Sequence, residues 1–152
     1  MSIDVLNECG YAVDEVELVG CARHVLGQMH VHPDADLVIT LVDEATMAHL
    51  HQRWMQLPGP TDVLSFPMDE LRPGRVGAPP PEGVLGDVVL CPTVAERQAA
   101  EAGHAPVEEL LLLTTHGILH LLGFDHAETT DRDEMFELQR QLLLTFLAGR
   151  RR

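Results

Sequence analysis

Lysine is absent from this sequence of 152 residues, and all ten of its basic residues are arginines. Acidic residues number 24, so the formal net charge is −14 and the isoelectric point is near 4.8. Non-specific binding of nucleic acid depends on basic patches, so this balance argues against a protein that captures polyanions with its whole surface. Arginine forms bidentate contacts with phosphate, however, so a few well-placed arginines could still serve a local phosphate site.

Other features are also scarce. No apolar run approaches the ~20 residues that a membrane-spanning helix needs, and the acidic N-terminus, "MSIDVLNE", lacks the basic region of a signal peptide. The cysteines Cys9, Cys21 and Cys91 are odd in number and form no CxxC cluster, which predicts buried thiols in a reducing compartment. With a mean hydropathy of +0.03, we expect a soluble globular protein located in the cytoplasm and not in a membrane.

The patterning predicts one α+β domain over residues 1–152, with a basic tail at 150–152. β-rich runs favour a mixed sheet of about four strands packed against helices. We expect the strands at 3–8, 35–43, 61–69 and 85–92. We expect the helices at 14–28, 45–54, 93–103, 106–123 and 131–148. The Pro- and Gly-rich segment 70–84 is expected to be an exposed, mobile loop.

Local signals predict where these helices begin and which way they face. Asp14 is placed to cap the first helix, and Thr93 with Glu96 has the spacing of a capping box. Gly103 and Gly123 are expected helix ends. One apolar face on the second helix is predicted from the helical spacing of Met47, Leu50 and Trp54.

The stretch "HGILHLLGFDH" carries the strongest chemical signal. His116 and His120 are i, i+4 on a predicted helix and project from the same face. Gly123 can end that helix and let the chain return His126 to the same point. Two histidines alone would favour structural residues of a core helix, but three at this spacing, with Gly123 at the turn, predict a zincin-like site with an open fourth position, typical of catalytic zinc. Three imidazoles also suit other divalent transition metals.

The residue after the first histidine is Gly117, where metalloproteases of the HExxH type have a glutamate that acts as general base. Without that carboxylate, amide hydrolysis is disfavoured, whereas phosphodiester cleavage mainly needs charge stabilisation around phosphorus. Asp125 could orient a ligand as its hydrogen-bond acceptor or could stabilise a turn. The remaining histidines are expected on the surface or at helix caps; they are His24, His30, His32, His49, His51 and His104.

The signature "HGILHLLGFDH" resembles that of the YbeY family, and so does a second block, "TDVLSFP" (61–67). The segments "GDVVLC" (86–91) and "IDVLNE" (3–8) resemble two further family strands, so the resemblance covers essentially the whole domain. It implies a zinc-dependent, single-strand-specific endoribonuclease that matures the 3′ end of 16S rRNA and takes part in ribosome quality control.

The resemblance also implies site residues. The zinc ligands would be His116, His120 and His126, and an active-site arginine upstream of the second block would be Arg53, although the spacing to that block is longer here than is usual. Thr61, Asp62 and Ser65 would be polar lining of the cleft, or ordinary turn and strand chemistry.

Two other functions remain open at this point. One is a metallopeptidase or other metallohydrolase with a substitute base, such as Asp62. The other is a non-catalytic ribosome-assembly factor with a structural metal. The acidic surface suits docking to basic proteins of the small ribosomal subunit or to a GTPase partner, which could deliver rRNA to the site.

Overall fold

A computed structural model describes residues 2–31, 34–68, 83–124 and 129–149 of the chain. Its elements, in chain order, are β1 (Ser2–Asn7), α1 (Glu15–Gln28), β2 (Asp36–Leu41), α2 (Glu44–Met55), β3 (Val63–Pro67), β4 (Val84–Leu90), α3 (Pro92–Ala102), α4 (Pro106–Leu121) and α5 (Thr129–Gly149). These are the strands and helices predicted from the sequence, with ends shifted by a few residues. The predicted loop falls mostly outside the described residues, although Val84 already belongs to β4.

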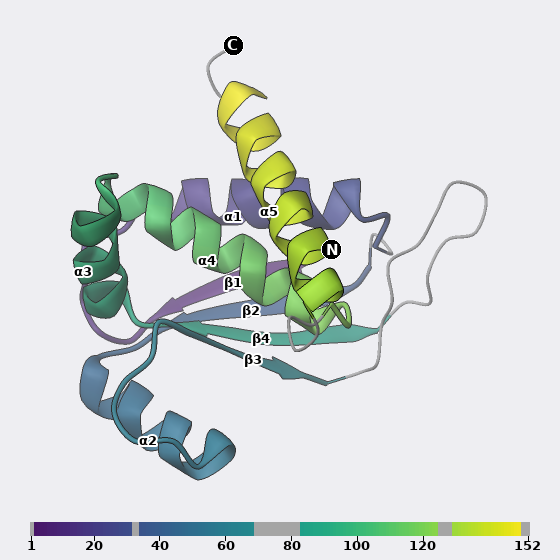
Figure 1. Cartoon of the computed structure of the whole chain (residues 1–152). Helices are drawn as coiled ribbons and strands as arrows, with labels where there is room; N and C mark the ends of the chain where they lie inside the picture. Colours follow the sequence, from purple (N-terminus) through teal and green to yellow (C-terminus); the bar gives the residue numbers. More distant parts are fainter. Residues whose placement is uncertain (1, 32–33, 69–82, 125–128, 150–152) are drawn as a thin grey trace.

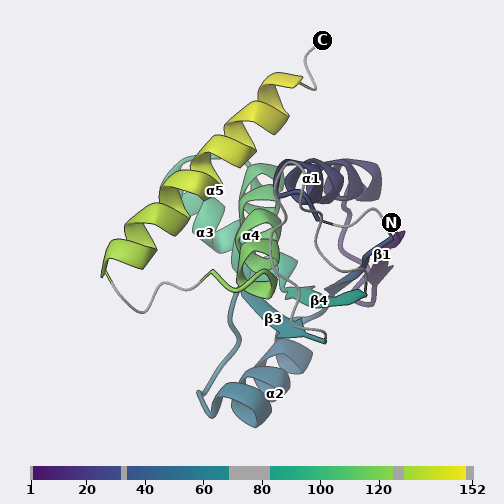
Figure 2. The same cartoon turned by 90° about the vertical axis from the view of Figure 1, so that its right-hand side faces the viewer.

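The four strands form one mixed sheet in the order β1-β2-β4-β3. β1, β2 and β4 run parallel, whereas β3 pairs antiparallel with β4 and forms an edge of the sheet. Figures 1 and 2 show α1, α4 and α5 above one face of the sheet and α2 below the other. The predicted α+β domain with a mixed four-stranded sheet is therefore confirmed.

Two apolar clusters lie on opposite faces of the sheet. The larger one forms where α1, α4 and α5 meet the strands, and β4 contributes Val88 and Leu90 to it. The smaller one contains Val89 of β4, Leu64 of β3 and Met47 of α2. Because neighbouring residues of a strand point to opposite faces, β4 supplies side chains to both cores.

Several predicted helix ends are confirmed. The Asp14 side chain accepts a hydrogen bond from the Glu17 backbone N–H at 3.1 Å and so caps α1. Gly103 and Gly123 have φ values of 79° and 97°, a left-handed conformation that suits glycine at a helix end.

Two local predictions were wrong. Thr93 does not cap α3: the helix begins at Pro92, and Cys91 occupies the cap position without a side-chain hydrogen bond that caps the helix. Trp54 does not face the core, because its side chain is 56% exposed, whereas Met47 on the same helix is fully buried. The helical spacing therefore predicted the inward face correctly at the start of α2 but not at its end.

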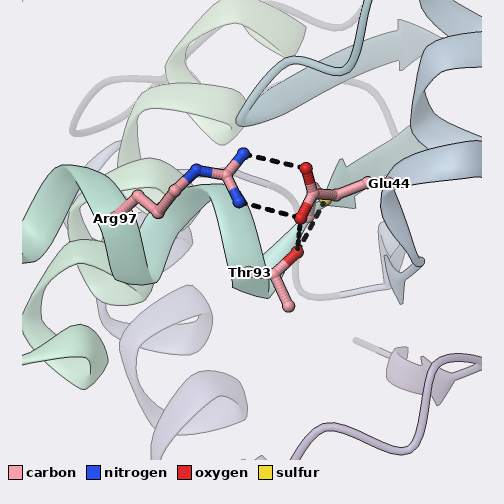
Figure 3. A network of polar contacts seen from close by, with 4 residues as sticks. Glu44, Thr93 and Arg97 are labelled. Atoms are coloured by element: carbon pink, nitrogen blue, oxygen red, sulfur yellow. Dashed lines mark hydrogen bonds and ion pairs between the residues drawn. The ribbon is translucent and has the colours of Figure 1, made fainter.

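Thr93 instead helps to join α2 to α3 (Figure 3). Its hydroxyl donates to Glu44 at 2.7 Å, and the Arg97 guanidinium donates to both oxygens of the same carboxylate at 2.9 and 2.8 Å. These hydrogen bonds hold the pKa of Glu44 well below its usual value, at about 2. The network connects α2, below the sheet, to α3, beside one end of the sheet.

Among the helices of the described ranges, none combines the length and the apolar character that crossing a membrane requires.

Candidate functional site

A cavity of about 490 Å³ opens at the edge of the sheet formed by β3. Side chains from both faces of β3 line it, together with one face of α4, the C-terminal half of α2 and part of α5. The lining residues are His51, Met55, Thr61, Asp62, Val63, Leu64, Ser65, Phe66, Leu112, Leu113, His116, His120 and Gln139. The cavity therefore lies where residues predicted to be functional from two separate sequence blocks meet.

His116 and His120 face this cavity from α4. Their ring centroids are 4.9 Å apart, with the rings nearly perpendicular, as the i, i+4 spacing predicts. His116 also lies 6.2 Å from the ring of Phe136 on α5. The helix thus presents two imidazoles, one turn apart, to the same space.

Gln139 contacts one of these rings through a hydrogen bond. The distance from His116 Nδ1 to Gln139 Oε1 is 2.8 Å. An amide oxygen can only accept a hydrogen bond, so Nδ1 is the donor in this contact, and in the neutral ring Nε2 then keeps its lone pair. This is the tautomer that a metal-binding histidine needs when Nε2 is the ligand atom, and the partner on α5 also fixes the orientation of the ring.

The third predicted ligand, His126, and its neighbour Asp125 lie outside the described residues. Within the described ranges, no group of three or more His, Cys, Asp or Glu side chains is arranged to hold a metal ion. His116 and His120 fit such an ion by their chemistry and shared orientation, and the three-histidine site as a whole stays a prediction.

The predicted polar residues of the second block all line the cavity. Asp62 Oδ1 accepts hydrogen bonds from the Val63 backbone N–H at 2.7 Å and from the Thr61 hydroxyl at 3.2 Å. The Ser65 hydroxyl donates to the carbonyl oxygen of Gly117 at 2.9 Å. The Asp62 contacts stabilise the turn before β3, and the Ser65 contact joins β3 to α4. Each of these side chains therefore has a structural role in addition to lining the cavity.

Gly117 lies where α4 approaches the sheet most closely. A methyl group added at this position would lie 2.8 Å from Val88 Cγ1 and 3.2 Å from Ser65 Oγ. Such short contacts are not tolerated without movement of the neighbours. The side-chain direction at position 117 is therefore toward β4 and β3, and a glutamate would not fit there without displacing the helix.

Arg53 is not among the residues that line the cavity. It lies on the exposed side of α2, with its guanidinium carbon 5.3 Å from the centre of the Trp54 ring. Its catalytic role stays a prediction. His51 and Met55, which stand on either side of it in sequence and are i, i+4 to each other, reach the cavity instead.

Two polar lining residues were not found from the sequence. His51 was expected on the surface, but it borders the cavity and its Nδ1 lies 2.9 Å from the carbonyl oxygen of Gly59. Gln139 gave no signal, because its relation to His116 depends on how α5 packs on α4. The sequence did contain one indication for His51: it is i, i+4 to Met55 on a helix that ends just before "TDVLSFP", so the two side chains point to the same side.

The prediction of buried thiols is confirmed for two of the three cysteines. Cys21 and Cys91 are fully buried, and Cys9 is half-buried. Burial raises the pKa of Cys21 to about 11 and also raises the pKa of Cys91. Neither buried thiol is among the lining residues of the cavity.

Comparison with known proteins gives a consistent result. The family model described as Endoribonuclease YbeY matches residues 6–147. A protein named Endoribonuclease YbeY from Beutenbergia cavernae is 68% identical over 150 residues, which cover 99% of this chain and 100% of the relative. The relative of the same name from Leifsonia xyli subsp. xyli is 62% identical, covering 96% of this chain and 95% of its own.

The fold also has a solved counterpart. The solution structure of TM1509 from Thermotoga maritima superposes with a TM-score of 0.66 at 29% sequence identity, covering 98% of this chain and 91% of that protein. With a family model spanning nearly the whole domain and relatives this similar over their full length, the chain belongs to the endoribonuclease YbeY family.

Proposed function

We propose that this protein is a metal-dependent endoribonuclease that cleaves single-stranded RNA during rRNA processing, at the 3′ end of 16S rRNA, and acts in ribosome quality control. The observation that carries the proposal is the pair His116 and His120, which face one cavity beside the block "TDVLSFP". The relatives named Endoribonuclease YbeY support RNA as the substrate. A ribosomal substrate is consistent with a cytoplasmic location.

The donor set favours Zn²⁺, held by His116 and His120 and by the predicted third ligand His126. When bound, such an ion lowers the pKa of a coordinated water and stabilises negative charge on a phosphate oxygen. The chain's own residues prepare the site: Gln139 keeps the lone pair on His116 Nε2, and the Ser65 hydroxyl ties β3 to α4 beside the histidines. Arg53 is proposed as the cation that contacts the phosphate.

The metallopeptidase alternative loses support at Gly117. The space beside this residue is occupied by Val88, so the glutamate of an HExxH enzyme has no place there. Asp62, the candidate substitute base, uses Oδ1 to accept two hydrogen bonds within its own turn. The free edge of β3 could pair with an extended peptide, so hydrolysis of a peptide library by the zinc-loaded protein remains the direct test of this alternative.

The assembly-factor alternative rests on charge. A net charge of −14 suits docking to basic proteins of the small ribosomal subunit, or to a GTPase partner, better than direct capture of RNA. Binding to such partners is compatible with catalysis, since a partner can deliver the RNA. The two roles separate if a His116→Ala variant without metal still binds ribosomes and restores their assembly.

The decisive experiment combines metal analysis with RNA cleavage. We expect about one zinc per chain in the purified protein, and most of this metal should be lost in His116→Ala, His120→Ala and His126→Ala, together with cleavage of single-stranded RNA. His49→Ala is the matched control, because this histidine is exposed on α2 and does not line the cavity. Zinc-loaded protein that leaves RNA intact, or His120→Ala protein that cleaves it as well as wild type, would refute the proposal.

A further inference from the structure

An exposed aromatic surface continues from the wall of the cavity. Trp54, the single tryptophan of the chain, is 56% exposed at the end of α2. Its ring lies edge-on to Phe66 of β3, with centroids 6.0 Å apart. Phe66 and the neighbouring Met55 both line the cavity. We call Trp54, Met55 and Phe66, with Arg53 above the indole, the Trp54 platform.

Exposure alone would mean little, because single apolar side chains are common on protein surfaces. The Trp54 platform differs in two respects. It is continuous with the candidate site, and a guanidinium lies over one of its aromatic rings, 5.3 Å from the centre. No carboxylate of the described ranges forms an ion pair with Arg53. An aromatic ring and an arginine presented together, next to a cavity, match the chemistry with which proteins hold unpaired nucleobases.

The overall charge points to the same mode of binding. A molecule with a net charge of −14 repels a polyanion at long range, so phosphate attraction alone cannot supply most of the affinity for RNA. Stacking of a base on an aromatic ring depends little on the phosphate charge and tolerates any base. In a duplex the bases are already stacked on one another and are not available to such a ring.

We propose that the Trp54 platform stacks an unpaired nucleobase of single-stranded RNA and so leads the chain into the cavity, with Arg53 contacting the adjoining phosphate or base. This inference rests on the proposed endoribonuclease function, and it adds how the substrate is held. Selection for single strands then comes from the stacking surface and not from the metal ligands.

The single tryptophan makes the proposal directly testable. We would titrate the zinc-loaded protein with a 2′-O-methylated oligouridylate, check by gel that the oligonucleotide stays intact, and follow Trp54 fluorescence. Fluorescence quenching that saturates is expected with the single strand and not with a duplex of the same length. In anisotropy measurements with labelled oligonucleotide, Trp54→Ala should weaken binding by about 5- to 150-fold, whereas Trp54→Phe should keep most of the affinity.

Leu144→Ala is the matched control, since Leu144 is 57% exposed on α5, nearly the same fraction as Trp54. It should bind RNA as wild type does. Unchanged affinity in Trp54→Ala, or equal quenching by duplex and single strand, would overturn the stacking proposal. RNA cleavage by wild-type protein would still stand in that case, so the two proposals fail separately. Loss of a dimer in Trp54→Ala, with no quenching by RNA, would assign the surface to a second copy of the chain and would also overturn it.

Discussion

Gly117 combines two tasks in one residue. Its lack of a side chain allows α4 to approach Val88 of β4, and its carbonyl oxygen accepts the Ser65 hydroxyl. Both contacts are close to His116, so the packing of this glycine sets the distance between the histidines and the strand that borders the cavity. The absence of a general-base carboxylate at position 117 therefore has a packing reason as well as a chemical consequence.

We predict that Gly117→Ala destabilises the protein although alanine favours helices. Replacing a mid-helix glycine by alanine gains about 1 kcal/mol from helix propensity, but forced overpacking costs about 1–3 kcal/mol. A Cβ only 2.8 Å from Val88 Cγ1 belongs at the upper end of that cost. We expect a net loss on the order of 1–2 kcal/mol in the free energy of unfolding measured by urea denaturation.

Two variants control this prediction. Gly117→Ala should reduce the free energy of unfolding by less in a Val88→Ala background than in the wild type, because the clash with Val88 Cγ1 is then absent. A double-mutant cycle measures this coupling. Gly27→Ala places the same substitution on the exposed side of α1, where nothing lies within 4 Å of the added methyl group, and should be neutral or stabilising. Equal effects of the substitution at positions 27 and 117 would contradict the packing argument.

Gln139 acts on the proposed metal through His116. Replacing it with an apolar side chain removes the acceptor that lies 2.8 Å from His116 Nδ1. Loss of such a partner typically lowers metal affinity by about 10- to 100-fold, and we predict this for Gln139→Leu in competition with a chromogenic zinc chelator. Gln139→Glu should retain affinity, because a carboxylate also accepts from Nδ1. Gln141→Leu, two residues along the same helix, should behave as wild type; equal zinc affinity in all these variants would mean that Gln139 does not orient the ligand.

At the scale of elements, the sequence predicted what local signals determine. The cap at Asp14, the glycine ends and the i, i+4 pair His116 and His120 depend on neighbours within a turn or two, and the structure confirms each of them. The final turn of α2 does not depend on local spacing. It extends beyond the small core below the sheet, so Trp54 is exposed while His51 turns to the cavity.

Contacts between segments distant in sequence could not be predicted either, because they too depend on how the elements pack and not on local spacing. Gln139 forms a hydrogen bond with His116 because α5 packs on α4. Thr93 donates a hydrogen bond to Glu44 because the sheet brings α3 and α2 together. Neither pair has a spacing that periodicity could reveal. The family resemblance pointed to the predicted ligands and to the strand that lines the cavity, but not to the contact between Gln139 and His116.

The hydrogen bonds between Glu44 of α2 and α3 predict that the stability of the fold depends on pH. The pKa of Glu44 is lowered to about 2 by its hydrogen bonds to Arg97 and Thr93, whereas an unfolded glutamate titrates near 4.5. A carboxylate with a lowered pKa stabilises the folded state fully above its unfolded pKa, and this contribution disappears as the pH falls toward 2. Wild type should therefore melt at a higher temperature than Glu44→Gln at pH 7, and the difference should shrink between pH 4.5 and pH 2.

Arg97→Gln removes the other partner and should reproduce the behaviour of Glu44→Gln. Since the pair is exposed at the surface, salt should also reduce the difference in melting temperature. A difference that stays constant from pH 7 to pH 2 would show that the carboxylate charge does not contribute to holding α2.

At the scale of the whole molecule, the two cores differ in size and in the helices that cover them. The core above the sheet is covered by α1, α4 and α5 and supports the histidines of α4. The core below the sheet is smaller and is covered by α2, with Val94 of α3 packed against it, and α2 also carries the Trp54 platform. Regions with few buried apolar contacts open at a lower free energy than the main core. We infer that α2 opens before the helices that cover the larger core.

The buried thiols report on each core separately, because Cys21 belongs to the upper core and Cys91 to the lower one. Burial raises the pKa of both, so neither reacts as a thiolate until its core opens. In a Cys9→Ser background under mild denaturant, we predict that a thiol reagent modifies Cys91 before Cys21, as peptide mapping by mass spectrometry would show. Adding Arg97→Gln should speed modification of Cys91 without changing that of Cys21, because it weakens the attachment of α2 to α3 and leaves in place the Glu44 charge that raises the pKa of Cys91. Equal rates for the two thiols in both backgrounds would mean that the cores open together and that α2 has no independent opening.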